Sequence, residues 1–531
     1  MQGLATTLRL LTKTENEAAL RVLLPALDAP NPAIQEGALV AILNRRNPAG
    51  GREILRRMPT MSPEWKAIIR QHHGRITGTL RDAVLGSDVQ MCRNGCQAAV
   101  WFREYDLIPT LLTVLQDANS PHADLAADTL LGLLENLYDE LAGTRDRSDR
   151  RDPQLIRRYV VGALEPAVQR YGQHKRREVI EAFLLLVGRD NVTLKQILQS
   201  PHQPAFAAMV EVLHKSSRKG VIRLLLSFLD DPHVPSSALA VIAGRSDLKF
   251  VQYLLKKIGH EPSAAVAQSL KRVETVAWLR NGDSLWRQLD DAAQHALVRL
   301  VMASGIPRLQ AFLTIEDVLL YGRTGGRREA AHALAEFHGA EANTLALKAL
   351  EDRDPHVQAH IVSQLRSRGI PGVLPGLVEM VDSPHAVVRK AARESLAEFS
   401  FKRFLGAFDL LDDEVRQSTG LLVKKIDPQT VPLLKEELGS LVRTRRLRAL
   451  AIARLIGAVD ALEGVILAMV DDEDHMVRME AVAALGRCGT AASYQALQRA
   501  TRDRSEVVRQ TAQRGLQDRV PIAPRPGPAK E

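Results

Sequence analysis

Residues 471–475, DDEDH, place four carboxylates and an imidazole side by side. Such oxygen and nitrogen donors bind divalent metal ions, so the stretch raises the question of a metal site. A metal site needs ligands that converge, whereas consecutive residues around a turn point in different directions. We interpret the stretch as a helix N-cap in which the Asp474 side chain accepts an orphan backbone N–H. No metal ligand and no cofactor is therefore predicted.

Two other groups of residues could do chemistry. Cys92 and Cys96 are four residues apart, downstream of His72 and His73, and would share one face of a helix. This spacing is a weak zinc signal beside a pair of CxxC motifs, and two buried small residues are the simpler interpretation. The glycine-rich segment 321–330 matches no phosphate-binding loop, so we interpret it as a linker or a helix cap.

The turn around Asp474 recurs along the chain with a period close to 30 residues, which is typical of helical repeats. The first apolar residues after the turns are Val357, Val388, Val415, Leu447, Val477 and Val508. Small or apolar residues follow four and eight positions later, such as Ala481 and Leu485 after Val477, and Ala451 and Leu455 after Leu447. This spacing predicts one buried stripe on a helix. A second apolar helix precedes each turn, so the predicted unit is helix, turn, helix.

Pro-His pairs mark several of these turns, at Pro121, Pro201, Pro232, Pro355 and Pro384. Ser or Asp precedes each pair, and Asn31-Pro32 makes the same arrangement. A capping side chain followed by Pro predicts the start of a helix, because the first helical position needs no N–H partner. The carboxylates to which we assign a structural role in the repeat turns are Asp231, Asp354, Asp382 and Asp474.

These features resemble HEAT repeats, in particular the short, roughly 30-residue kind named after phycobilisome lyases. The resemblance rests on the turn Asp, the Val after it, an Arg one position later and a small residue in the second helix. The Arg position is filled by Arg389, Arg416, Arg448, Arg478 and Arg509, and Gln358 replaces it in one copy. The resemblance implies that the turn Asp and this Arg stack as a ladder between units. It also implies an all-α fold, an α-solenoid of stacked antiparallel helix pairs of the ARM/HEAT type.

Some members of the family that this sequence resembles are enzymes, and they need catalytic or ligand residues that this sequence lacks. A di-iron hydroxylase of this kind takes its ligands from several His-Glu pairs, and only His260-Glu261 is present. Bilin lyases need a bilin pocket, which no motif identifies. Alkylpurine DNA glycosylases use Trp and Asp around the nucleotide; here Trp278 and Trp286 flank Asp283, but aromatic packing at helix ends is the simpler interpretation. We therefore expect a non-enzymatic scaffold that binds protein partners.

The composition and the first residues of the sequence indicate the cellular compartment of the protein. The 531 residues include three cysteines, too few for a disulfide framework, which favours a reducing compartment. The first residues lack a basic segment followed by an apolar one, and no apolar run approaches the length of a membrane span. We expect a cytoplasmic protein that does not enter the membrane.

The net charge of +9 is concentrated in one region. Residues 143–177 hold ten Lys/Arg and four Asp/Glu, which gives +6. The predicted partner-binding patch is Arg157, Arg158, Arg170, Lys175, Arg176 and Arg177, with two tyrosines interleaved. Such a patch could contact the phosphates of a nucleic acid or the surface of an acidic protein, and the sequence leaves both alternatives open.

Repeat regularity predicts the organisation of the chain. We expect N-terminal HEAT-like repeats over 1–142, a charged loop over 143–153, and degenerate helical repeats over 154–340. Regular HEAT repeats follow over 341–516. A disordered, proline-rich tail then covers 517–531, because four prolines in so short a segment cannot continue a helix.

Overall fold

The computed structural model describes residues 2–143, 151–279 and 285–518, and within these ranges the regular structure is all helical, without a β-strand. Contacts divide the chain into unit 1, Met1–Val318, and unit 2, Leu319–Glu531, and each is described by itself. The predicted all-α solenoid fold, built from stacked helix pairs, is confirmed.

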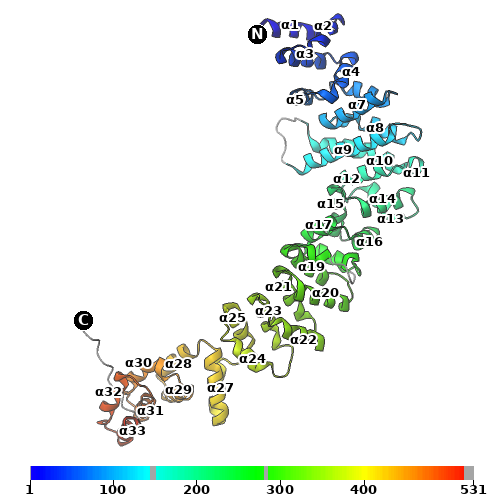
Figure 1. The fold of residues 1–531 in the computed structure, drawn as a ribbon. Coiled ribbons are helices and arrows are strands. Elements are labelled where there is room, and N and C mark those ends of the chain that lie inside the picture. Colours follow the sequence, from blue (N-terminus) through cyan, green and yellow to red (C-terminus); the bar gives the residue numbers. More distant parts are fainter. Residues whose placement is uncertain (1, 144–150, 280–284, 519–531) are drawn as a thin grey trace. The chain divides into compact units, whose positions relative to one another are not determined.

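The helices of unit 1 come first along the chain (Figure 1). They are α1 (Gln2–Lys13), α2 (Ala18–Ala26), α3 (Pro32–Arg45), α4 (Pro48–Arg56), α5 (Pro63–Gln71), α6 (Thr77–Leu85), α7 (Val89–Phe102), α8 (Ile108–Gln116), α9 (Ala123–Ala142), α10 (Pro153–Gln169), α11 (Tyr171–His174), α12 (Arg177–Leu186), α13 (Val192–Gln199), α14 (Pro204–Lys215), α15 (Lys219–Ser227), α16 (Ser236–Gly244), α17 (Leu248–Ile258), α18 (Ala264–Leu270) and α19 (Asp291–Ala303).

The division between the units falls within α20 (Arg308–Tyr321). The helices that follow are α21 (Thr324–Ala333), α22 (Ala340–Ala349), α23 (Pro355–Leu365), α24 (Val373–Met380), α25 (Ala386–Ser395), α26 (Phe401–Ala407), α27 (Asp413–Ile426), α28 (Thr430–Leu438), α29 (Arg443–Leu455), α30 (Val459–Met469), α31 (His475–Leu485), α32 (Ala491–Ala500) and α33 (Glu506–Gln517). Short 3₁₀ helices are η1 (Met58–Thr60), η2 (Tyr105–Leu107), η3 (Phe228–Asp230), η4 (Ala277–Leu279), η5 (Leu285–Gln288), η6 (Leu334–Glu336) and η7 (Phe408–Leu410).

Each unit is a two-layer stack, and most helices of the layers named below pack on the next helix of the same layer. In unit 1 one layer runs α1, α3, α5, α7, α9, α12, α15, α17, α19, and α2, α4, α6 and α8 follow one another in the other. In unit 2 one layer contains α21, α23 and α25 and continues with α27, α29, α31 and α33. Because each helix contacts only near neighbours, stability accumulates along such a stack rather than in one central core.

The buried stripes explain why these segments are helical. Val477, Ala481 and Leu485 are completely buried on α31, and Val508 and Ala512 are likewise buried on α33. Small residues at the middle position let neighbouring helices approach closely. The predicted four-residue spacing is therefore confirmed in these copies.

The predicted helix starts hold for some turns and fail for others. Asn31 and Asp354 cap α3 and α23 with Pro at the first helical position, and Asp474 caps α31. The starts predicted at Pro121, Pro201, Pro232 and Pro384 are wrong, because the helices begin two to four residues later, at Ala123, Pro204, Ser236 and Ala386. In the turns led by Ser120, Asp231 and Ser383, the side-chain oxygen accepts the N–H two residues on and closes a local turn before the helix.

The predicted segments 1–142, 154–340 and 341–516 remain predictions, and the division by contacts falls at 318/319. Most of the predicted charged loop, residues 144–150, and almost all of the predicted tail, residues 519–531, lie outside the described residues. Gln517 still belongs to α33, so the helix extends one residue into the predicted tail. No described helix is both long and apolar enough to cross a bilayer.

Candidate functional site

Arg478 connects neighbouring turns of unit 2. Its Nη1 donates to the carbonyls of Asp472 and Glu473 in its own turn, at 2.8 and 3.0 Å. Its Nε and Nη2 make a bidentate pair with Asp503 in the next turn, at 2.9 and 3.0 Å. The hydrogen bonds from Arg478 hold the pKa of the Asp503 carboxyl below its usual range. The residue is only 3% exposed, and four of its five guanidinium N–H groups donate within the protein, which indicates a structural role.

The same ladder contact occurs at two other positions of unit 2. Arg446 pairs with Asp472 at 3.1 Å and donates to the Ser440 carbonyl, and Arg327 pairs with Asp352 at 2.9 Å. In each pair the carboxylate lies 25 or 26 residues after the arginine. The ladder that the HEAT resemblance implied is therefore present, but not at all the predicted residues.

The predicted register of the α29 copy is wrong by two residues. Arg448, the predicted ladder residue, pairs instead with Asp409 at the surface. The buried residues of α29 include Ala449, Ile452 and Ala453, whereas the predicted Ala451 is exposed. The physical reason is that Arg445, paired with Glu437, occupies the position that Val477 fills in α31. A register based on the first apolar residue therefore slips.

Val415 was also predicted to be buried, and it is 46% exposed. Its helix, α27, buries Gly420, Val423 and Ile426 instead. Arg416 donates to the carbonyls of Phe408 and Leu411, so its guanidinium serves its own turn and no ladder carboxylate of the next turn.

The glycine-rich segment 321–330 is not a linker. Its second half forms the start of α21, in which Arg327 is 5% exposed and carries the ladder contact. The sequence held the signal: GRREAAHAL at 326–334 aligns with VRMEAVAAL at 477–485, with Gly326 in place of the Val.

The remaining predicted turn residues of unit 2 have local roles. Arg389, Arg509 and Gln358 each donate to the backbone carbonyl six residues earlier, at 2.7 to 2.8 Å. Gln358 thus replaces the Arg in closing the turn. Asp382 caps no helix; it is 68% exposed and pairs with Lys425 at 2.7 Å.

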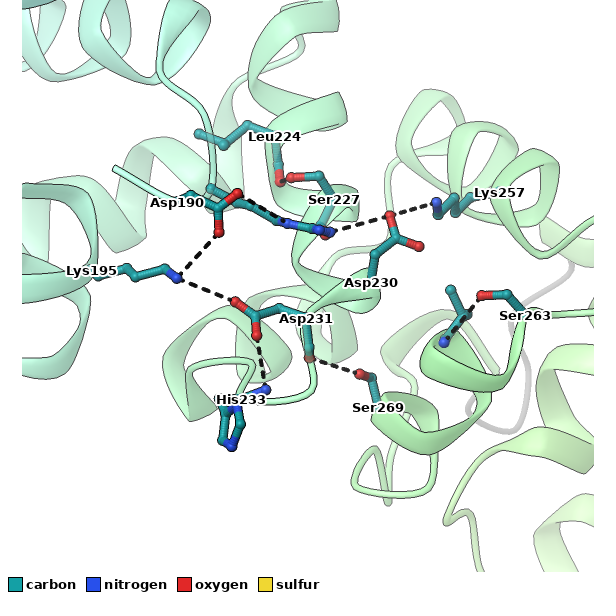
Figure 2. Close-up of polar contacts among 12 residues, drawn as sticks. Asp190, Lys195, Leu224, Ser227, Asp230, Asp231, His233, Lys257, Ser263 and Ser269 are labelled. Carbon is teal, nitrogen blue, oxygen red and sulfur yellow. Dashed lines mark hydrogen bonds and ion pairs between the residues drawn. The ribbon is translucent and has the colours of Figure 1, made fainter. Parts of the chain in front are cut away.

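Asp231, in unit 1, lies in a network of charges between α13, η3 and α17. Figure 2 shows Lys195 between Asp190 and Asp231, at 3.3 and 3.6 Å, while Lys257 meets Asp230 at 2.7 Å. The His233 N–H donates to Asp231, and with Lys195 it holds the pKa of that carboxyl below its usual range. Every carboxylate of this cluster has a protein partner, which indicates that it fastens neighbouring helices together.

The structure does not bring the predicted basic patch together. Arg157 and Arg158 lie in the first half of α10, whereas Arg170 follows its last residue, about 20 Å further along at 1.5 Å per residue. Arg170 lies directly before α11, and Lys175, Arg176 and Arg177 lie at the turn from α11 to α12. Arg157 donates to the Leu186 carbonyl at 2.7 Å, and Arg176 pairs with Asp124 at 3.2 Å. The six cations thus form two groups, and some of them already have partners.

Arg177 lies in a groove that the sequence did not predict. The groove, about 740 Å³, is formed by α9, α12, the α14–α15 turn and the start of α17. We call it the charged groove. Its charged lining residues are Glu135, Asp139, Arg177, Glu181, Glu211, Lys215, Arg218, Lys219 and Lys249. Five cationic and four anionic side chains from distant parts of unit 1 therefore face one open space.

Ion pairs fix part of this lining. Glu181 accepts from Ser216 at 2.7 Å and from Arg218 at 3.1 Å. Glu211 pairs with Lys215 at 3.0 Å and Arg177 at 2.8 Å, and both cations, with Lys215 first, hold the pKa of Glu211 below its usual range. Lys219 is exposed and has no polar contact among the described residues. The pairs hold the walls in place, and Lys219 remains able to bind a ligand.

The other candidates for chemistry lie apart. Cys92 and Cys96 are both buried on α7, where the Cys92 thiol points towards the Val84 carbonyl. Trp278 is completely buried and Trp286 nearly so, while Asp283 lies outside the described residues. His260 packs its ring on His295 at 4.8 Å. Across the described ranges, no three His, Cys, Asp or Glu side chains are grouped so as to hold a metal ion.

Comparison with known proteins identifies repeats in unit 2. Residues 324–397 and 431–517 match the family model of HEAT repeats. The matched segments cover all three ladder pairs and leave out 398–430. The sequence matches no curated protein.

Solved structures with a similar arrangement are only distantly related. One comes from a study of the phosphorylation switch between cadherin and beta-catenin, with 14% identity and a TM-score of 0.37, covering 94% of this chain and 98% of that one. Kap121p has 14% identity and a TM-score of 0.26, covering 92% of this chain and 57% of Kap121p. A Kap95:Nup1 complex has 14% identity and a TM-score of 0.23, covering 97% and 80%.

Proposed function

We propose that this chain is a non-enzymatic HEAT-repeat scaffold that binds a protein partner in the charged groove of unit 1. The observation that carries the proposal is the groove itself, an open space of about 740 Å³ lined by charged side chains of both signs. Protein surfaces carry both signs of charge and can match such a lining, whereas a nucleic acid needs an uncompensated positive strip.

The walls of the groove suit recognition because they are held before a partner arrives. Glu181, Ser216 and Arg218 fix one another, and Lys249 donates to the Ser217 carbonyl at 2.6 Å. Preorganised side chains lose less entropy on binding, which favours affinity. Lys219, at the start of α15, is the side chain we expect to pair with a carboxylate of the partner.

The placement of the predicted patch supports a protein partner over a nucleic acid. Its cations form two groups, one in the first half of α10 and one on either side of α11, and Arg177 already pairs with Glu211 across the charged groove. All three cysteines are buried thiols outside any disulfide, which fits a reducing compartment, and we propose that the scaffold works in the cytoplasm.

The test is affinity purification of the full chain from native lysate, with and without nuclease, followed by mass spectrometry. We expect a discrete protein partner that survives nuclease treatment and is lost with the double variant Lys219→Glu/Lys249→Glu. The matched control is Lys348→Glu, an exposed lysine of α22 outside the groove.

Two results would contradict the proposal. Loss of the co-purified proteins after nuclease treatment would indicate that the partner is a nucleic acid. The binding surface would then be the separated cations of α10 and of the α11–α12 turn. Recovery that survives both the nuclease and the double variant would place the binding surface elsewhere.

A further inference from the structure

The layer of helices in unit 2 is interrupted once. The neighbours α21 and α23, α23 and α25, α27 and α29, α29 and α31, and α31 and α33 all pack on each other, but α25 and α27 make at most marginal contact. The segment 398–430, which the HEAT-repeat model leaves out, begins directly after α25 and includes α26 and α27. A continuous hydrophobic core resumes with Phe401 and extends to Ala512. The packing of neighbouring helices, the hydrophobic core and the match to the HEAT-repeat model are therefore all interrupted between α25 and α27.

A groove of about 500 Å³ lies at this break, formed by α25, the segment after it and the end of α27. We call it the junction groove. Its accessible apolar residues include Ala397, Phe399 and Pro428, and the buried Leu396 and Ile426 lie behind them. Elsewhere in the layer a neighbouring helix covers the equivalent face, so here an apolar surface is left for another occupant.

Cations of α25 border this apolar surface. The Lys390 side chain is 78% exposed, and its ion pair with Glu394 is long, at 3.8 Å. Arg389 donates from a single nitrogen, Nη1, to the carbonyls of Ser383 and Pro384. The Nε of Arg393 is buried and has no hydrogen-bond partner. No described carboxylate forms an ion pair with Arg393.

The carboxylate at the far wall of the junction groove is not available to these cations. Asp427 accepts from the backbone N–H of Phe401 and of Gln429, each at 2.9 Å. With Arg389, Lys390 and Arg393 against Glu394 and Asp427, the lining carries one net positive charge beside its apolar residues. A buried guanidinium nitrogen without a partner is destabilising unless something completes it.

We propose that the junction groove binds an acidic, apolar segment of a protein partner. A bulky apolar side chain of the partner fills the space over Phe399 and Pro428, and a carboxylate next to it accepts hydrogen bonds from Arg393 and attracts Lys390. The fit follows from charge complementarity, because the floor takes the apolar group and the uncommitted cations take the anion. The inference rests on the proposed scaffold role but uses a surface separate from the charged groove.

The experiment uses a phage-displayed library of random 16-residue peptides selected on the full-length chain. Selected peptides are then synthesised with a fluorescent label, and their Kd is measured by anisotropy. We expect enrichment of Asp or Glu beside Leu, Phe or Trp. We also expect Arg393→Glu to weaken binding by about tenfold or more, the scale of one lost charge-assisted hydrogen bond.

Two further variants sharpen the assignment. Ala397→Trp fills the junction groove from its exposed edge and should weaken the same peptides. Arg403→Glu makes the same charge change at an exposed residue of α26 outside the junction groove, and should leave the Kd unchanged. All the variants alter side chains outside the hydrophobic core, so an unchanged unfolding midpoint verifies that each one folds.

Several outcomes overturn the proposal: no enriched peptides, peptides rich in Lys and Arg, binding insensitive to both Arg393→Glu and Ala397→Trp, or self-association of the chain that these variants abolish. Peptides that lose affinity only with Lys219→Glu/Lys249→Glu would refute the junction groove while supporting the charged groove. The two proposals therefore fail separately.

Discussion

Units 1 and 2 fasten neighbouring helices together in different ways. In unit 1, arginines at helix ends donate to backbone carbonyls of a neighbouring helix: Arg45 to Leu11 at 2.7 Å, and Arg245 to Leu213 and Ser216 at 2.8 and 3.0 Å. Unit 2 has such contacts at Arg368 and Lys424, but it adds the ladder of Arg327, Arg446 and Arg478 with the next turn's carboxylate.

This difference explains why a regular repeat pattern is easier to recognise in the sequence of unit 2 than in that of unit 1. A helix C-terminus offers orphan carbonyls whatever its residues are, so a cation can satisfy them without any acidic partner. The ladder instead requires Arg and Asp at fixed positions in successive copies. Only the second arrangement leaves a periodic pattern, which is why the HEAT-repeat match lies wholly in unit 2.

The largest expected effect is for Arg245→Ala in unit 1. Arg245 is 1% exposed, and its loss leaves two buried carbonyls unsatisfied. We expect the free energy of unfolding to fall by about 3 kcal/mol. Urea unfolding together with hydrogen exchange of α14 and α16 measures the change. A loss below that of Arg478→Ala would reverse the comparison between the units.

Arg478→Ala should be next, at about 2 kcal/mol, because it removes a buried bidentate pair. Arg478→Lys should rescue little of this, since an ammonium cannot form the two parallel hydrogen bonds to Asp503. A double-mutant cycle with Asp503→Ala measures the coupling. A coupling near zero would mean that the ladder does not fasten these repeats.

The register of the α29 copy is tested by comparing Arg446→Ala with Arg448→Ala. Arg446 joins two turns, whereas Arg448 makes a surface pair with Asp409. We expect about 1.5 kcal/mol for the first and less than about 0.5 kcal/mol for the second, measured by thermal unfolding. Equal losses would restore the register that the apolar pattern predicted.

A helix cap should matter equally in either unit, which provides a baseline. Asn31 accepts from the Ala33 N–H at 2.9 Å, and Asn31→Ala should lower stability by about 1 kcal/mol. Asn31→Ser keeps an acceptor and should lose much less. The unfolding midpoints of the two variants are compared with that of the parent. An Asn31→Ala protein as stable as the parent would show that this cap does not contribute to stability.

The smallest expected effect is a pH dependence of the ladder. Because Arg478 lowers the pKa of Asp503, the contribution of this carboxylate is present above its unfolded pKa and is lost as pH falls through the lowered folded value. Unfolding midpoints of the parent and Asp503→Asn should therefore differ most at neutral pH and converge below about pH 4. A gap that widens on acidification would contradict this sign.

Much of unit 2 could be predicted from its sequence, because each copy repeats its apolar stripe every few residues. The prediction failed where a charged or small residue replaced the marker Val, at Arg445 and Gly326, and so the ladder arginines Arg446 and Arg327 were missed. The local sequence of Arg327 still held the signal, since an Arg followed two residues later by Glu-Ala recurs in α21 and α31, whereas Arg446 is followed by Arg-Ala at those positions.

The charged groove was beyond sequence reasoning. Its walls come from residues between 135 and 249, on five helices and a turn. Lys215, Arg218 and Lys219 are visible as a basic run, but the carboxylates that pair with Arg218, Glu135 and Glu181, come from α9 and α12. Only the stacking of the layers decides which charges meet.

The weak contact between α25 and α27 also has a mechanical consequence. In a stack joined only through neighbours, a pulling force breaks the weakest joint first. Residues 401–517, which share one core, would then separate from the rest of the stack and unfold together. Their unfolding would release about 400 Å of extended chain at roughly 3.5 Å per residue. A ligand seated in the junction groove would brace that joint, so the tension that the molecule bears would depend on whether its partner is bound.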